Sequence, residues 1–356
     1  MNLPKQNKRY WRDYQKEIPT DHFFYVRSCI RQTFSPGAEA TLLNTFTELL
    51  HLDIYEDARH TCCTGIGYHT DVIPLETTMT VIARQLSLMQ EAGYQNLLVS
   101  CVTSFGLYNE VIDIWHHFPE KLVETQKHLF QATGRSFELP VTVIHASDLV
   151  YKYRQELKPF LKYQLVHRAS GEPLRVVDHV GCHYAKIFPE KGVGGAEFPQ
   201  VLSGLAAEWG GASVDYAERR HCCGFGFRHY LLKDNRGYSL THSRIKLESM
   251  APAKPDLILT NCPGCNMFLD RWQYTLAEME GVTYDTAGRG IPVLSFEELM
   301  GLLLGVDPWV LGLQMHQVQV ESLMDKIGVD YSPKTKYLDA QGKYIGKPQK
   351  PDVLIV

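Results

Sequence analysis

The sequence lacks the features that would direct it to a membrane or to nucleic acid. No stretch of about 18 apolar residues occurs among its 356 residues, so we expect no membrane span. The formal net charge is only −4, which argues against general nucleic-acid binding. Residues 1–21 contain neither an apolar segment nor a small-residue cleavage site, so no secretory signal is apparent. A cytoplasmic protein is therefore predicted.

A disulfide framework is also excluded. The nine cysteines are an odd number, and without a secretory signal we expect a reducing compartment. Clustered thiols in such a compartment are more often metal ligands or redox centres than disulfides. The hydrophobic content of 44% is enough for a sizeable core, and the length predicts two or three domains.

Five cysteines form a pattern in the second half of the chain, which we name the second cysteine set. It consists of Cys182, the vicinal pair Cys222 and Cys223, and Cys262 and Cys265 of a Cys-Pro-Gly-Cys segment. The long spacers between these groups can each hold a strand, a helix and a turn, so they can bring distant thiols to one point. Gly224 allows both vicinal thiols to face one centre, and Pro263 stiffens a loop between the last two.

Several kinds of chemistry are compatible with these thiols. They could be free buried cysteines, Cys262 and Cys265 could form a thioredoxin-type redox pair, or four of the five could bind zinc. An ordinary cubane cluster takes four thiolates, so five exceed its needs. Either one cysteine is spare, one thiolate bridges, or the cluster is opened into an irregular shape. The vicinal pair, which thioredoxin motifs do not need, favours an iron–sulfur cluster.

The order of predicted elements repeats along the chain. In the first half we expect strands at 23–26, 97–99 and 141–144, and helices at 38–50, 75–89 and 107–131. In the second half we expect strands at 174–177, 257–259 and 292–294, and helices at 198–209, 239–250 and 296–304. Ser295 and Glu298 form a capping box at the start of the last helix. Strands that alternate with helices predict parallel α/β units, which gather ligands at the carboxyl ends of their strands.

Four further cysteines occur at matching places in the first half and are named the first cysteine set. They are Cys29, Cys62, Cys63 and Cys101. We infer an internal duplication of about 140 residues. The predicted fold is α/β, with two pseudo-symmetric repeats that have short parallel sheets and flanking helices. The expected parts are an N-terminal arm (1–21), a first repeat (22–160), a second repeat (174–316) and a basic C-terminal tail (326–356).

These motifs resemble the cysteine-rich CCG domain, and the duplication resembles the B subunit of heterodisulfide reductase. The resemblance covers residues 22–316 and includes the segment from Ile291 to His316. In that family each complete set holds a noncubane [4Fe-4S] cluster that binds and cleaves a disulfide. The resemblance implies electrons from a ferredoxin-type partner, the C subunit, and behind it a flavin-containing A subunit. For the second cysteine set it implies a noncubane [4Fe-4S] cluster.

The first cysteine set departs from the family pattern. Ser104 stands where the fifth cysteine would be, and Thr64 stands where a glycine would follow the vicinal pair. Four thiols are compatible with an altered noncubane cluster near Ser104, with a cubane, or with zinc. We predict a modified [4Fe-4S] cluster here, with zinc as the alternative.

Histidines surround both vicinal pairs at similar offsets. They are His60, His69, His221 and His229. Their ordinary role would be packing or hydrogen bonding, and the alternative is tuning of cluster sulfurs or proton supply to a leaving thiolate. Candidate catalytic residues are therefore Ser104, His69 and His229. Lys186 and Arg228 could attract an anionic substrate.

The functional hypothesis is an iron–sulfur subunit that handles disulfide, thiol or persulfide groups. We favour the heterodisulfide-reductase-like complexes of sulfur oxidisers, in which a lipoate-binding protein delivers sulfur, because that branch tolerates altered sites. Reduction of the methanogenic CoM-S-S-CoB heterodisulfide is one alternative. Another is a noncatalytic electron-transfer subunit of a succinate, glycolate or lactate oxidising complex, although the sequence has no ferredoxin-type CxxCxxC set. A third is a zinc-only interaction protein.

Overall fold

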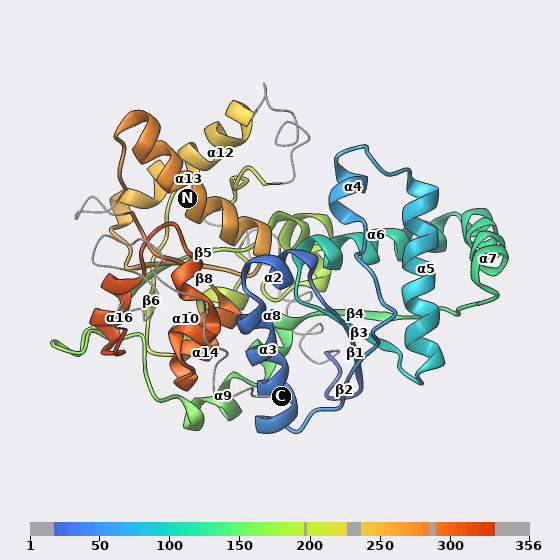
Figure 1. Ribbon diagram of the computed structural model, residues 1–356, viewed down its shortest axis with the longest axis horizontal. Coiled ribbons are helices and arrows are strands. Elements are labelled where there is room, and N and C mark those ends of the chain that lie inside the picture. Colours follow the sequence, from blue (N-terminus) through green and yellow to red (C-terminus); the bar gives the residue numbers. More distant parts are fainter. Residues whose placement is uncertain (1–17, 196–197, 226–235, 285–289, 332–356) are drawn as a thin grey trace, which may run out of the picture.

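Each half of the chain builds one four-stranded parallel sheet (Figure 1). The computed structural model describes residues 18–195, 198–225, 236–284 and 290–331. The first sheet has the order β2-β1-β3-β4 and the second has the order β6-β5-β7-β8. The strands are β1 (Phe23–Val26), β2 (Ile54–Glu56), β3 (Asn96–Val99), β4 (Thr142–His145), β5 (Arg175–His179), β6 (Ala212–Ser213), β7 (Leu257–Thr260) and β8 (Val293–Ser295). The predicted α/β fold with two parallel sheets is confirmed.

Helices connect these strands and cover the sheets. In the first half they are α2 (Cys29–Phe34), α3 (Pro36–Asn44), α4 (Gly65–His69), α5 (Leu75–Glu91), α6 (Val102–His117), α7 (Pro119–Thr133), α8 (Ala146–Lys152) and α9 (Arg154–Leu157). In the second half they include the π-helical segment η3 (His183–Ile187), α10 (Val201–Glu208), α12 (Arg236–Met250), α13 (Pro263–Glu280), α14 (Phe296–Leu304), α15 (Pro308–Leu311) and α16 (Glu321–Ile327). The capping box of Ser295 and Glu298 is present at the start of α14.

Three sequence-based expectations need correction. The helix expected over 107–131 is two helices, because Phe118 leaves the helical conformation and Pro119 starts α7. The helix expected over 38–50 changes to a π-helical turn at Thr45–Leu49. Pro263 is not in a loop but at the first position of α13, where its missing N–H costs no hydrogen bond.

The strand registers of the two sheets match position by position. In the first sheet Val26, the last residue of β1, pairs with Val99 of β3. In the second sheet His179, the last residue of β5, pairs with Thr260 of β7. The central strands β1 and β5 are buried over most of their length. The register therefore makes Val26 and His179 equivalent positions.

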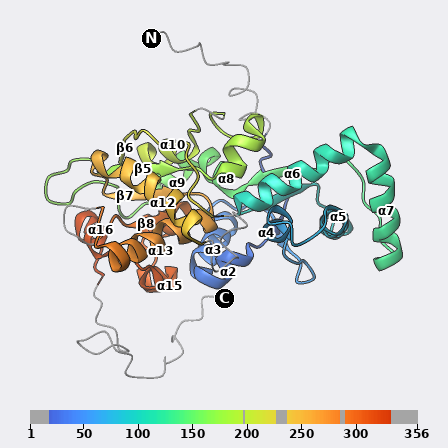
Figure 2. The same ribbon diagram turned by 90° about the horizontal axis from the view of Figure 1, so that it is seen from above.

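The halves pack against each other through reciprocal pairs of helices. Contacts of α3 with α14 are matched by contacts of α8 with α10, and contacts of α2 with α13 by contacts of α6 with η3. Figure 2 shows α7 extending away from this interface at one end of the molecule, with α16 at the other. The halves approach closely at Gly181, where an added Cβ would lie 2.5 Å from Cγ2 of Val102. Glycine is required there because a side chain would push the halves apart.

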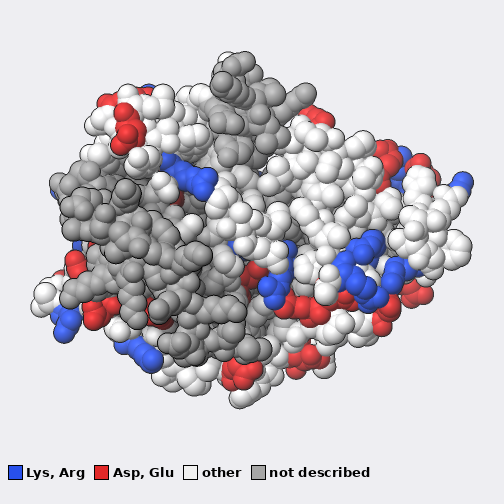
Figure 3. Space-filling model, in the orientation of Figure 1, with Lys and Arg blue, Asp and Glu red and all other residues white. Residues whose placement is uncertain are grey.

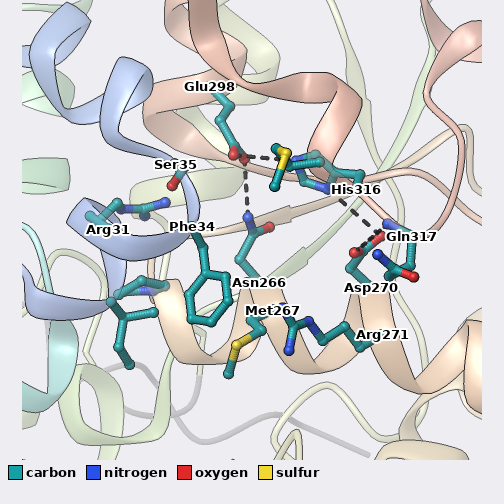
Figure 4. Close-up of a pocket in the computed structure, with 13 residues that line it drawn as sticks. Arg31, Phe34, Ser35, Asn266, Met267, Asp270, Arg271, Glu298, His316 and Gln317 are labelled. Carbon is teal, nitrogen blue, oxygen red and sulfur yellow. Dashed lines mark hydrogen bonds and ion pairs between the residues drawn. The ribbon is translucent and has the colours of Figure 1, made fainter. Parts of the chain in front are cut away.

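A buried ionic network lies beside this interface (Figure 4). The ring of His316 lies 3.2 Å from Oε1 of Glu298 and 3.6 Å from Oδ1 of Asp270. Asn266 donates to the other oxygen of Glu298, at 3.1 Å. Burial alone would lower the pKa of His316, but the charge of Glu298 and the contact with Asp270 raise it to about 10. The imidazolium is therefore retained at neutral pH.

This network predicts a loss of stability at alkaline pH. Because the pKa of His316 rises from 6.5 to about 10 on folding, its stabilising effect is complete below pH 6.5 and is lost as the pH rises through 10. We expect the wild-type protein to lose on the order of 3–4 kcal/mol over this window, and His316→Gln to lose much less. Midpoints of anaerobic urea denaturation at several pH values test this. His117→Gln, at an exposed ring, should keep the wild-type slope; equal slopes for both variants would contradict the assignment.

Charged side chains of both signs share the surface. On the face seen in Figure 3, basic and acidic residues lie next to one another over the described part. Within the described residues, no helix combines the length and the apolar character needed to cross a bilayer.

Candidate metal centres

The thiols of the second cysteine set converge at the carboxyl ends of β5 and β7. Sγ of Cys223 lies 3.1 Å from Sγ of Cys265. Cys182 forms a side-chain hydrogen bond with Cys222, and Cys262 forms one with Cys265. All five thiols are free, and three are buried. The structure therefore brings together all the cysteines that the sequence grouped here.

The first cysteine set converges in the same way. Its four thiols line one small cavity together with Ser104. Sγ of Cys62 lies 3.7 Å from Sγ of Cys29, and Oγ of Ser104 lies 3.1 Å from Sγ of Cys63. The Ser104 hydroxyl therefore takes the place that the Cys265 thiol takes in the second set, at the same distance from the second vicinal cysteine.

The two sets meet across the interface between the halves. Cys101 is the N-cap residue of α6 and Cys262 is the N-cap residue of α13. The partial positive charge at the start of a long helix favours a thiolate or a negatively charged group at both places. Burial raises the pKa of Cys101 to about 11, and the nearby Cys262 raises it too. The sets are thus close enough for their charges to interact.

The residue after each vicinal pair has a left-handed conformation. Gly224 has φ = +95°, and Thr64 has φ = +67° at the equivalent place. This conformation turns the chain so that the vicinal thiols face one side, and it is costly for a β-branched residue. The first repeat retains the turn although it has lost the glycine that suits it.

Substitution of Gly224 should be strongly destabilising. In Gly224→Ala the added Cβ would lie 2.4 Å from the carbonyl oxygen of Ser239, in addition to the cost of a positive φ. We expect a loss of about 2–4 kcal/mol in the free energy of unfolding, measured by chemical denaturation. Gly134→Ala is the matched control, because Gly134 has φ = +70° but open space around it. It should lose only about 1 kcal/mol, and an equal loss in both would refute the steric argument.

The thiols of each set cannot all ionise together without a cation. Burial raises the pKa of Cys223, and its hydrogen bond with Cys223 raises the pKa of Cys265. In the first set the hydrogen bond from Cys29 lowers the pKa of Cys62 to about 2, whereas that of Cys63 is raised. A metal that binds the sulfurs removes this conflict, since thiolates are its ligands. The donor sets therefore fit thiolate-bound metal centres.

Comparison with known proteins agrees with this geometry. The model of the CCG cysteine-rich domain matches residues 176–270. The chain is 26% identical over 324 residues to the B subunit of ferredoxin:CoB-CoM heterodisulfide reductase from Methanosarcina acetivorans, a match that covers 88% of this chain and 98% of that protein. The chain is similar over most of its length to the B subunits of heterodisulfide reductases and contains a CCG cysteine-rich domain.

Two further similarities extend the comparison. The chain is also 24% identical over 289 residues to the 8-methylmenaquinol:fumarate reductase membrane anchor subunit of Wolinella succinogenes, over 79% of this chain and 92% of that protein. A hypothetical protein from Helicobacter pylori of known crystal structure has a TM-score of 0.59 at 12% identity. The match covers 90% of this chain but 58% of that protein, so it shows the fold alone.

Buried charges hold the vicinal turn of the second cysteine set. The amine of Lys246, fully buried, donates to the backbone carbonyls of Glu218, Arg219 and His221. The guanidinium of Arg219 donates to the carboxylate of Asp178, which is itself buried in β5. The turn that leads into Cys222 is thus fixed by a lysine and an ion pair that sequence analysis did not single out.

The predicted histidines lie in different surroundings. The rings of His69 and His183 lie 4.3 Å apart across the interface between the halves. His221 lies 3.0 Å from His242, and His60 contacts the backbone carbonyl of Asp57. Of the predicted histidines that the structure describes, only His69 lines the cavity shared with the second set. His229 and Arg228 fall outside the described residues.

Sequence analysis missed His179. Its ring lies within 4.8 Å of the sulfurs of Cys223 and Cys265, and these three side chains could share a metal ion. Burial lowers the pKa of His179 well below its usual value, so the imidazole is neutral. The signal was present in the sequence as a histidine at the end of an apolar strand, where the other repeat has Val26.

Proposed function

We propose that the chain is the iron–sulfur subunit of a heterodisulfide reductase-like complex and that it carries redox chemistry of disulfide, thiol or persulfide groups. The observation that supports this most strongly is the meeting of two thiol sets at the interface between the halves, with Cys101 and Cys262 at adjacent helix starts. Relatives that align over nearly their whole length are B subunits of heterodisulfide reductases.

The two sets hold different clusters in this proposal. The second set, Cys182, Cys222, Cys223, Cys262 and Cys265, binds a noncubane [4Fe-4S] cluster. The first set, Cys29, Cys62, Cys63 and Cys101, binds a modified [4Fe-4S] cluster rather than zinc. The position of the Ser104 hydroxyl, 3.1 Å from Sγ of Cys63, supports a site that has lost one thiol but kept its shape. Metal analysis of anaerobically prepared protein should give about eight irons and no zinc; about four irons with one zinc contradicts this assignment.

The cavity between the sets is the proposed reaction site. Ile66, His69, Val102 and Thr103 line it from the first half, and Cys182, His183, Phe225, Cys262 and Cys265 from the second. Iron–sulfur clusters supply single electrons, and cleavage of a disulfide to two thiols takes two electrons and two protons. The apolar side chains exclude water. Nε2 of His69 is buried without a hydrogen-bond partner among the described residues, so it is placed to hold a proton for a leaving thiolate.

The partners follow from the same proposal. A ferredoxin-type C subunit would exchange electrons with the clusters, and a flavin-containing A subunit would be connected to the clusters through the C subunit. We favour sulfur oxidation with a lipoate-binding protein as the physiological setting. The altered first set supports this choice. Reduction of CoM-S-S-CoB is the alternative.

Electron paramagnetic resonance of the oxidised protein tests direct sulfur chemistry. Spectra are recorded with and without a thiol, using dihydrolipoamide and coenzyme M as probes. A thiol that binds at the proposed site should change the signal of one cluster, and free methionine added at the same concentration should not. If no thiol changes any cluster signal, direct substrate binding is wrong.

A second candidate function rests on the similarity to the fumarate reductase anchor protein. In that case the chain would transfer electrons without binding a sulfur substrate. The same spectra separate the two functions. An electron-transfer protein shows clusters that are reduced by a partner but are unaffected by thiols.

A further inference from the structure

His179 ends β5 at a place where the fold does not require a histidine. Its equivalent in the first sheet is Val26, which precedes Cys29 by three residues just as His179 precedes Cys182. Both side chains are 2% exposed. A valine therefore fills this position equally well, and a reason other than packing is needed for the imidazole.

The imidazole has no hydrogen-bond partner. Neither Nδ1 nor Nε2 of His179 finds one among the described residues, although both are buried. Buried polar atoms are nearly always paired, so two orphaned ring nitrogens in one side chain indicate a missing partner. Nearby Lys246 does not fill this role, because its amine is occupied by three backbone carbonyls.

The missing partner lies on the side of the thiols. The ligating atoms of His179, Cys223 and Cys265 lie within 4.8 Å of one another. Tetrahedral coordination with metal–nitrogen bonds of roughly 2.1 Å and metal–sulfur bonds of roughly 2.3 Å puts two donors of one ion about 3.6 Å apart. Shifts of roughly 1 Å at most bring the three donors to this separation.

We propose that His179 binds iron of the second centre through a ring nitrogen, beside Cys223 and Cys265. This deepens the proposed function, on which it rests, because it takes the centre to be an iron–sulfur cluster. The second centre then has one imidazole donor in addition to thiolates, and the first centre has none at the equivalent position.

Pulsed electron paramagnetic resonance on protein that contains ¹⁵N-labelled histidine tests the proposal. In the wild-type protein a strong ¹⁵N coupling should appear on the signal of the second centre. It should vanish in His179→Val, the residue that the first repeat has at this position. The matched controls are His183→Gln and His221→Gln, because these histidines adjoin Cys182 and Cys222 in sequence; both should keep the coupling.

The other outcomes are decisive as well. A cluster signal of normal intensity without ¹⁵N coupling overturns the role of His179 and leaves the proposed function intact. A coupling that survives in His179→Val assigns the nitrogen to another histidine and also overturns the proposal. Protein without iron after anaerobic preparation overturns both the proposed function and this inference. Iron content is measured on every variant, so loss of the cluster in His179→Val, with normal content in both controls, supports ligation.

Discussion

Cys265→Ser will make the second centre resemble the first, and Ser104→Cys will make the first centre resemble the second. These two residues occupy equivalent positions and lie at the same distance, 3.1 Å, from the second cysteine of their vicinal pairs. In Cys265→Ser the second set keeps four thiols and gains a hydroxyl, as in the first set, so the iron content should stay near the wild-type value. The electron paramagnetic resonance signal of the second centre should shift toward that of the first, and loss of about half of the iron would show that the two positions are not equivalent.

Ser104→Cys is the reciprocal change. It gives the first set a fifth thiol where the cavity already accommodates an oxygen, so the iron content should remain near the wild-type value. The spectrum of the first centre should shift toward that of the second. Ser104→Ala is the control for loss of the hydroxyl alone and should keep the iron. If Ser104→Cys leaves the spectrum of the first centre unchanged, the missing thiol is not the cause of the difference between the centres.

Arg31→Met will strongly destabilise the interface between the halves. Arg31 of α2 is fully buried, and its Nη2 lies 2.6 Å from Oε2 of Glu297 in α14. The charges of Glu298 and Glu39 also act on it. Removal of the arginine leaves these carboxyl groups buried without the positive charge of the guanidinium beside them. We expect a loss of about 3–5 kcal/mol in the free energy of unfolding, measured by anaerobic chemical denaturation.

The double variant Arg31→Met with Glu297→Leu is the control. Replacement of both partners of a buried pair by apolar groups is often close to neutral, so it should recover much of the loss. Burial raises the pKa of Glu297 to about 8, although the charge of Arg31 lowers it. Wild-type stability should therefore fall as the pH rises from 4.5 to 8, and the double variant should lose this contribution and keep only the fall above pH 6.5 that comes from His316. A double variant as unstable as Arg31→Met would show that packing, not charge, is responsible.

The repeat and the strand ends could be predicted because they depend on local patterns. Apolar runs followed by cysteines identified β3, β5 and β7, and the stripe of Met79, Ile82, Leu86 and Met89 identified α5. The edge strands β2 and β6 were not predicted. They have three and two residues, and pairing with β1 and β5 rather than any pattern of their own makes them strands.

The thiols of the site were predictable, whereas the residues around them were not. Cysteine spacing grouped both sets correctly, because a long spacer of strand and helix returns to the same edge of a parallel sheet. Lys246 and Arg31 are ordinary charged residues in a sequence, and only the structure shows that they are buried. His179 became visible through the strand register, which aligns it with Val26.

The reciprocal helix contacts between the halves have the form of an interface in a homodimer with two-fold symmetry. In such a dimer any substitution appears at both sites at once. Joining the two copies in one chain removes that restriction, because each copy can then change alone. The loss of a thiol at Ser104 and the gain of an imidazole at His179 are changes of this kind. A fused chain can thus keep one pocket for structure or electron storage while the other specialises, which an assembly of identical copies cannot do.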